Sequence, residues 1–528
     1  MTKQSAALLA GVLMLASACN TDKFLDVNTN PNAPQLVTAN LYLPPMEHWL
    51  VTSPLYDGRY IGRYAQEYML PTTGTPTTWS RMGYDPTSDN GAQQWRDVYW
   101  SFGQNLADMM TKAQAEQRWD ILGVGQVLRA WGWQVLVDEH GPIIIKQAFD
   151  QTRSTFDYDT EQYAYFVVDS LLNEAVKNLK RTDGAVDQTY LAKGDYLYNG
   201  DRTKWMKFAY GLLAINHNHY SNKAAYNPTQ VIAYVDSSFV SSADNAIWTF
   251  SQKDPNLSDY NFLGQSRGNF PSYRQTQFVL NLMNGTDFGG VVDPRLTRML
   301  SSSPDGQYRG MDPNIPGGGA YTALTAPNNF YGFPAATRPT PNSGRYLFDD
   351  KVTIPVMTYA QLQFVKAEAA YRKGDKATAL TAYQAAVSAH IDFVNSKVAL
   401  NGDTSEHLIT SAEKAAFLAN PLIVPPAAGL TLSHIMSQKY IAQWGWAHNE
   451  LWLDLRRYHY TDIDPASGKQ VFIGFAIPTN LYPDNNGLPV YRIRPRYNSE
   501  YIWNIAALDA INARDPAYHT VPLWIIQP

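Results

Sequence analysis

The stretch from Met357 to Val394 constrains the fold of this 528-residue chain more than any other. Apolar residues recur at helical spacing on both sides of Gly374, so the stretch predicts two amphipathic helices joined by a tight turn. Gly374 lies where the first helix must end, because glycine adopts a left-handed conformation at little cost. Alanines alternating with Tyr383 let two antiparallel helices approach closely. One such pair cannot bury its own apolar face, so the chain must contain further helix pairs.

This helix pair resembles a tetratricopeptide unit, with one residue missing before the glycine. We therefore expect a mainly α fold, in which tetratricopeptide-like helix pairs form a scaffold and the strands are few and short. Helical periodicity predicts further helices over residues 46–69, 94–115, 119–137, 162–179, 205–220 and 433–457. Nothing between residues 46 and 528 resembles a flexible linker, so this span is predicted to be a single domain.

The helical period disappears between residues 248 and 355, where Gly, Pro, Asn and aromatic residues concentrate. A disordered segment would contain few aromatic residues. We therefore expect an ordered, loop-rich insertion that forms one face of the scaffold.

Residues 1–18 have the form of an export signal, because Lys3 precedes an apolar run that ends in small residues. Cys19 is the only cysteine, which excludes an internal disulfide and a cysteine-based metal site. Its position is typical of a bacterial lipoprotein signal, so we expect lipidation at Cys19; ordinary cleavage after Ala18 is the alternative. Residues 19–45 are rich in Asn and Pro, which predicts an extended tether. No later stretch is long and apolar enough to cross a bilayer, so the lipid would be the only membrane anchor.

Two sets of aromatic and polar residues are candidates for ligand binding. A sugar presents apolar C–H faces ringed by hydroxyls, so its site needs exposed aromatic rings beside polar side chains. The first set follows a Pro- and Thr-rich loop that offers its tryptophan no obvious core, and comprises Trp79, Arg81, Tyr84 and Asp85. The second set belongs to the loop-rich insertion and comprises Trp248, Tyr260, Arg267, Tyr273, Asn328, Asn329, Phe330 and Tyr331. Tryptophans within predicted helices are instead expected in the core: Trp95, Trp131, Trp205, Trp444 and Trp452.

Catalytic and nucleic-acid-binding functions are poorly supported. The segment from Gly264 to Gly268 matches the nucleophile elbow of serine hydrolases, which needs a buried strand before Ser266 and a helix directly after it. Polar residues precede the segment and Asn-Phe-Pro follows it, so that context is not met. We expect no catalytic residue, metal site or cofactor, and keep a secreted hydrolase using Ser266 as a remote alternative. The net charge of −5 provides no basic stripe for nucleic acid.

Several blocks together resemble the SusD/RagB family, in particular its SusD-like branch of outer-membrane lipoproteins from Bacteroidetes. These blocks are Cys19 with residues 22–32, residues 64–66, 293–296, 357–369, 438–457 and 494–500. The resemblance implies a lipid-anchored, surface-exposed protein that captures glycans and delivers them to a SusC-like TonB-dependent transporter. Two alternatives stay open: capture of peptides or another nutrient by the same fold with the same partner, and a helical-repeat scaffold for protein partners. The family has no shared catalytic motif, so the resemblance assigns no site residue.

Overall fold

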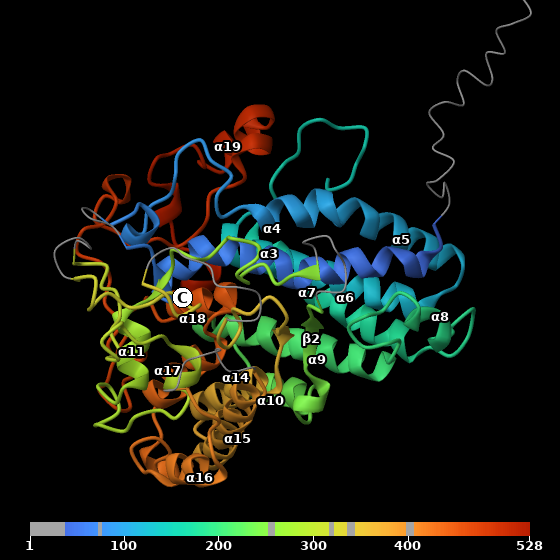
Figure 1. The fold of residues 1–528 in the computed structure, drawn as a ribbon. Coiled ribbons are helices and arrows are strands. Elements are labelled where there is room, and N and C mark those ends of the chain that lie inside the picture. The colour runs from blue at the N-terminus through green and yellow to red at the C-terminus, as the bar shows by residue number, and fades with distance from the viewer. Residues whose placement is uncertain (1–36, 72–75, 252–258, 316–320, 335–343, 398–405) are drawn as a thin grey trace, which may run out of the picture.

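The computed structural model describes residues 37–71, 76–251, 259–315, 321–334, 344–397 and 406–528 (Figure 1). The expected signal peptide, Cys19 and most of the tether lie outside these residues. The prediction that the chain stays extended to residue 45 is wrong, because η2 begins at Ala39 and α3 at Leu43. Within them, no helix combines the length and apolar character needed to span a membrane.

The N-terminal half is a layered array of helices, as the sequence predicts. Its elements are η2 (Ala39–Tyr42), α3 (Leu43–Tyr64), α4 (Gln93–Arg96), the π-helical turn η4 (Asp97–Ser101), α5 (Gly103–Ala115), α6 (Trp119–His140), α7 (Glu161–Lys180), α8 (Gln188–Ala192), α9 (Arg202–His219), η5 (Tyr220–Asn222) and α10 (Pro228–Asp236). Helix α6 packs on α5 and α7, and α9 packs on α7 and α10, so successive helices stack side by side (Figure 1). The helix expected over 94–115 is interrupted by η4.

The helix pair that opened the sequence analysis is confirmed. Helix α14 (Tyr359–Lys373) ends at Gly374, whose φ of 86° is left-handed, and Asp375 then caps α15 (Lys376–Asn395). Phe364 of α14 and Tyr383 of α15 are fully buried, and their ring centroids lie 6.2 Å apart between the two helices. Because α10 contacts α14, the pair extends the helical array of the N-terminal half.

The C-terminal part contains shorter elements than the sequence predicts. These are α16 (Ser411–Ala419), η8 (Ala427–Gly429), α17 (Leu432–Gln443), α18 (His448–Arg457), η9 (Pro483–Asn485), the π-helical turn η10 (Tyr497–Tyr501), α19 (Ile505–Ala510), η11 (Tyr518–Thr520) and η12 (Trp524–Ile526). The prediction of a single helix over 433–457 is wrong. Gly445 takes a φ of 87°, and the chain turns there between α17 and α18.

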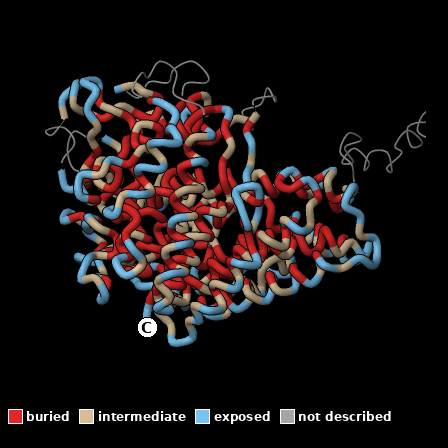
Figure 2. The backbone as a smooth tube through the Cα atoms, turned by 90° about the horizontal axis from the view of Figure 1, so that it is seen from below, coloured by how far each residue is buried: buried red, intermediate tan, exposed pale blue. Residues whose placement is uncertain are grey.

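The described residues of the loop-rich insertion include short helices and strands. It holds α11 (Gln277–Met283), α12 (Leu296–Met299), β3 (Arg274–Gln275) and β4 (Thr353–Met357). Strand β3 pairs antiparallel with β1 (Tyr68–Met69), and β4 pairs antiparallel with β2 (Ala246–Thr249), which follows η6 (Ser242–Asp244). The β1–β3 sheet therefore ties the insertion to a distant segment of the sequence, and the β2–β4 sheet brings the two ends of the insertion together. Buried residues run through the helical and the loop-rich parts alike (Figure 2).

Buried ion pairs join the helices at the centre of the scaffold. Glu368 of α14 accepts two hydrogen bonds from Arg457 of α18, at 2.9 and 3.0 Å, and one from the Tyr458 hydroxyl at 2.6 Å. Burial alone would raise the pKa of Glu368, but the Arg457 guanidinium holds it well below its usual range. These helices are thus fixed relative to each other by paired charges as well as by apolar packing.

Candidate functional site

The first candidate set does not form an exposed aromatic platform. Trp79 is only 3% exposed; its ring packs between Tyr60 and Tyr64, and its indole nitrogen donates to Asp85 at 2.8 Å. The expectation that Trp79 lacks a core is therefore wrong, because α3 supplies one from a distant part of the sequence. Gly91 is required here, since a Cβ at that position would lie 2.7 Å from the Trp79 ring.

Arg81 and Tyr84 of the first candidate set hold their loop against residues 480–484. Arg81 donates to the carbonyl and side chain of Asn480 and to the carbonyl of Leu481, at 2.8 to 3.0 Å. The Tyr84 hydroxyl donates to Asp484 at 3.1 Å, and burial raises the pKa of Tyr84 to about 12. Trp79, Tyr84 and Asp85 do line a common pocket of about 190 Å³ with Tyr497 and Tyr501, so the structure brings three of the four together.

The second candidate set is dispersed. Tyr273 and Phe330 belong to a stack of rings in the core, together with Phe270 and Phe348. Asn329 and Tyr331 are also buried, and their side chains bond to backbone groups of the same insertion. Burial removes these four side chains from any exposed binding face, which corrects the expectation.

The remaining members of the second set are half-buried and lie in different places. Trp248 of β2 contacts His48 of α3 and the exposed Tyr196, with ring centroids 5.6 and 6.3 Å apart. The Arg267 guanidinium lies 5.7 Å from the Phe262 ring. Tyr260 and Asn328 are half-buried as well. None of these four lines a shared pocket with another among the pockets of the described residues.

A larger hollow of about 670 Å³ lies beside the first pocket, and we call it the aromatic groove. Both π-helical turns contribute to its wall, through Trp100 of η4 and through Ser499 and Glu500 of η10. Its volume is in the range of small-ligand sites. Its lining comprises Trp95, Arg96, Tyr99, Trp100, Gln104, Ile144, Ala148, Phe149, Asp150, Gln151, Arg153, Phe156, Arg496, Ser499 and Glu500.

Trp100 is the exposed ring of this groove. Its side chain is 66% exposed, and the Arg96 guanidinium lies 4.5 Å from its centroid. The turn beneath it is held by Asp97, a buried carboxylate that accepts from the hydroxyls of Ser53 and Ser101 at 2.5 and 2.6 Å. A π-helical turn adds a residue to a helical turn and is frequent at functional sites. Here the turn presents a large indole to solvent, while Asp97 and Val98 of the same turn are buried.

The floor and the far wall of the groove are fixed by hydrogen bonds. Tyr99 exchanges two hydrogen bonds of 2.8 Å with the backbone of Ile144. Tyr158 donates to Glu500 at 2.7 Å, and burial raises the pKa of Tyr158 well above its usual value. Phe149 has a φ of 67°, an uncommon conformation for a bulky residue that often marks a functional site.

Polar groups suited to hydroxyls surround the exposed ring. Asp150 and Arg153 form an exposed ion pair at 3.1 Å, and Arg496 pairs with Asp89. The Nε of Arg496 and the hydroxyl of Ser499 are buried without a hydrogen-bond partner among the described residues. An exposed aromatic ring in a groove lined by polar side chains is suited to a sugar.

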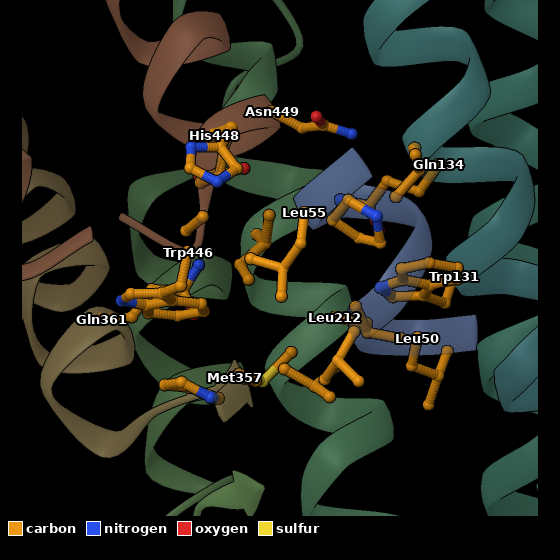
Figure 3. Close-up of a pocket in the computed structure, with 18 of the residues that line it drawn as sticks. Leu50, Leu55, Trp131, Gln134, Leu212, Met357, Gln361, Trp446, His448 and Asn449 are labelled. Atoms are coloured by element: carbon orange, nitrogen blue, oxygen red, sulfur yellow. The ribbon is translucent and has the colours of Figure 1, made fainter. Parts of the chain in front are cut away.

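Two other parts of the structure are less suited to a functional site: a small internal cavity and the segment around Ser266. A cavity of about 90 Å³ lies between Trp131 on one side and Trp446 on the other (Figure 3). This volume lies below the roughly 300–1,000 Å³ of small-ligand sites. Ser266 donates to Asp350 at 2.5 Å, and the next described helix, α11, begins only at Gln277, so the nucleophile-elbow context is absent there.

Asp138, His219 and Glu450 are close enough within the described residues to be considered as metal ligands. Each nitrogen of His219 faces a carboxylate, at 3.4 Å for Asp138 and 2.8 Å for Glu450. Burial would lower the pKa of His219, but the two carboxylates raise it to about 9. With a carboxylate facing each ring nitrogen, these three side chains form a buried ion-pair network.

A family model of the SusD-like type, described as starch-binding and associating with the outer membrane, matches residues 31–482. The chain belongs to the SusD-like family. Solved structures agree on the fold. A SusD/RagB family protein from Bacteroides thetaiotaomicron is 22% identical with a TM-score of 0.66, and the match covers 93% of this chain and 99% of the other. A chitin-binding SusD homologue from Flavobacterium johnsoniae is 19% identical with a TM-score of 0.65, covering 92% and 98%. No curated protein sequence matches the chain.

The family resemblance and the mainly α, tetratricopeptide-like fold are thereby confirmed. The sequence analysis missed Trp100 as a candidate. Its only sequence signal is an aromatic pair, Tyr99-Trp100, within a helical pattern, and only the inserted π-helical turn decides which of the two rings faces outward.

Proposed function

We propose that this SusD-like protein binds oligosaccharides in the aromatic groove without catalysing a reaction, and delivers them to a SusC-like TonB-dependent transporter. The exposed Trp100 on a groove of about 670 Å³ is the observation that carries the proposal. Its indole would stack on the C–H face of a sugar, while Arg96 and Arg153 would bond the hydroxyls. The family description as starch-binding, and the chitin-binding relative, support a glycan as the ligand.

The location at the membrane follows from the same family description, which names the outer membrane. We propose that lipidated Cys19 and the segment between it and η2 hold the protein on the cell surface beside its transporter. Mass spectrometry of the protein extracted from membranes tests this step. An acylated N-terminal Cys19 supports it, and an unmodified thiol contradicts it.

Calorimetric titration of the purified protein against a panel of plant, host and microbial oligosaccharides tests glycan binding. A second panel of mixed peptides tests the alternative ligand class. Binding to one glycan class that Trp100→Ala weakens at least tenfold supports the proposal. Heat from peptides alone would favour peptide capture by the same fold, and binding that survives Trp100→Ala would exclude the groove.

A further inference from the structure

A second pocket, of about 510 Å³, lies away from the aromatic groove and shares no residue with it. It is bounded by β2, by the segment that leads into β4, and by the end of α15. Its walls mix aromatic rings with hydroxyl and amide side chains: Phe250, Tyr346, Phe393, Ser242, Asn245 and Thr249. We call it the lysine pocket, because Lys397 also lines it.

Lys397 is an unusual lysine, since its side chain is buried without an acidic partner. The residue is only 8% exposed, and its amine donates to the backbone carbonyl of Thr353 at 2.8 Å. The Phe393 ring lies 4.0 Å from the same amine. No carboxylate of the described residues lies within ion-pair distance of it, whereas buried lysines are normally paired with one.

The charged groups around Lys397 do not compensate for its burial. Asp392, on the pocket wall, is engaged at 2.7 Å by Lys414, and the Arg298 guanidinium donates to the backbone carbonyl of Lys397 while pairing with Glu406. Asp349 and the exposed Lys351 complete the charged wall, and His390 of α15 is held neutral by burial. Burial lowers the pKa of Lys397 to about 7. A much larger fraction of its amine is therefore uncharged at neutral pH than in an ordinary lysine.

We propose that Lys397 is a carbonyl-reactive amine that captures small hydroxyaldehydes in the lysine pocket as a reversible imine. The Nζ lone pair adds to the aldehyde carbon, and the resulting carbinolamine loses its hydroxyl with a proton from nitrogen as one water molecule. A C=N bond replaces the C=O bond, with no oxidant or reductant involved. A desolvated lysine is a known route to such nucleophilic chemistry, and the hydroxyl and amide side chains of the wall suit the hydroxyl groups of the aldehyde.

The test uses the purified protein with glycolaldehyde and cyanoborohydride, which traps the imine, followed by peptide mapping of every modified lysine. Lys351 is the matched control, because it lines the same pocket but is exposed. At pH 7 we expect labelling at Lys397 to be at least tenfold faster than at Lys351. The labelling rate at Lys397 should rise through pH 7 and level off above pH 8.

Equal or slower labelling of Lys397 at pH 7 overturns the proposal, as does a rate that still rises between pH 9 and 10. Site mapping on the unaltered protein gives this answer even where a variant fails to fold. Lys397→Arg keeps a positive charge and should abolish the adduct at this position while leaving labelling of Lys351 unchanged. A loss of Lys351 labelling in that variant would instead mean that the pocket had collapsed.

Discussion

The stacked aromatic rings of the loop-rich insertion face inward, whereas the indole of the aromatic groove faces outward. Phe330 has no exposed surface and stacks on Phe348, with ring centroids 4.2 Å apart. Trp100 is 66% exposed in the π-helical turn η4. The insertion therefore uses its rings to build a core where regular structure is scarce, and the groove presents a ring to solvent from a well-supported helix. Aromatic content marks a loop region as ordered; it does not mark it as a binding face.

The largest expected effect is a loss of stability when the aromatic core of the insertion is disrupted. Phe330→Ala should reduce the free energy of unfolding by about 3–5 kcal/mol, because it leaves a cavity in a stacked aromatic cluster. Leu324→Ala in the same insertion is the control, since Leu324 is 63% exposed and should change stability by less than about 0.5 kcal/mol. Urea unfolding measures both. Similar small losses for the two variants would mean that the insertion has no such core.

The stability of the helical scaffold depends on pH through His219, whereas the packing of the aromatic core does not. The folded pKa of His219 is raised to about 9 from an ordinary 6.5, so its contribution to stability is fully present below pH 6.5 and is lost as the pH rises through 9. We expect the free energy of unfolding to fall by about 2–3 kcal/mol between pH 6.5 and pH 9.5. His219→Gln should flatten this profile, whereas Phe330→Ala should leave its slope unchanged. A variant profile as steep as the original contradicts the assignment.

A smaller effect on stability distinguishes the buried Trp79 from Trp100, which lines the aromatic groove. Trp79→Phe removes the indole bond to Asp85 inside the protein and should cost about 1–3 kcal/mol of stability. Glycan affinity should change less than twofold, because the Trp79 ring is buried and does not line the groove. Thermal unfolding and calorimetry on the same sample separate the two quantities. A large loss of affinity at unchanged stability would restore Trp79 as a ligand residue.

Much of the fold follows from local patterns in the sequence. Gly374, with apolar stripes on both sides, predicts α14 and α15 almost to the residue, and the helical tryptophans Trp95 and Trp205 are buried as expected. The break at Gly445 was missed because a glycine inside a helical pattern is often tolerated, and only the left-handed turn between α17 and α18 decides the matter.

The site was harder to predict, because exposure depends on contacts that are distant in the sequence. Trp79 has polar neighbours along the chain, yet Tyr60 and Tyr64 of α3 enclose it. Trp100 lies in a segment of helical character, where a ring is normally core, and is turned outward by one extra residue in the turn. Neither the burial of Trp79 nor the exposure of Trp100 can be recognised from the neighbouring residues in the sequence.

The central claim is that the aromatic groove binds the glycan through Trp100, and calorimetric titration of Trp100→Ala tests it most directly. Phe166→Ala is the matched control, because Phe166 is 64% exposed on α7 and does not line the groove. We expect both variants to unfold within about 0.5 kcal/mol of the original protein. Affinity for the glycan identified in the panel should fall at least tenfold, or about 1.4 kcal/mol, in Trp100→Ala alone. Unchanged affinity in Trp100→Ala, or an equal loss in Phe166→Ala, would contradict the account.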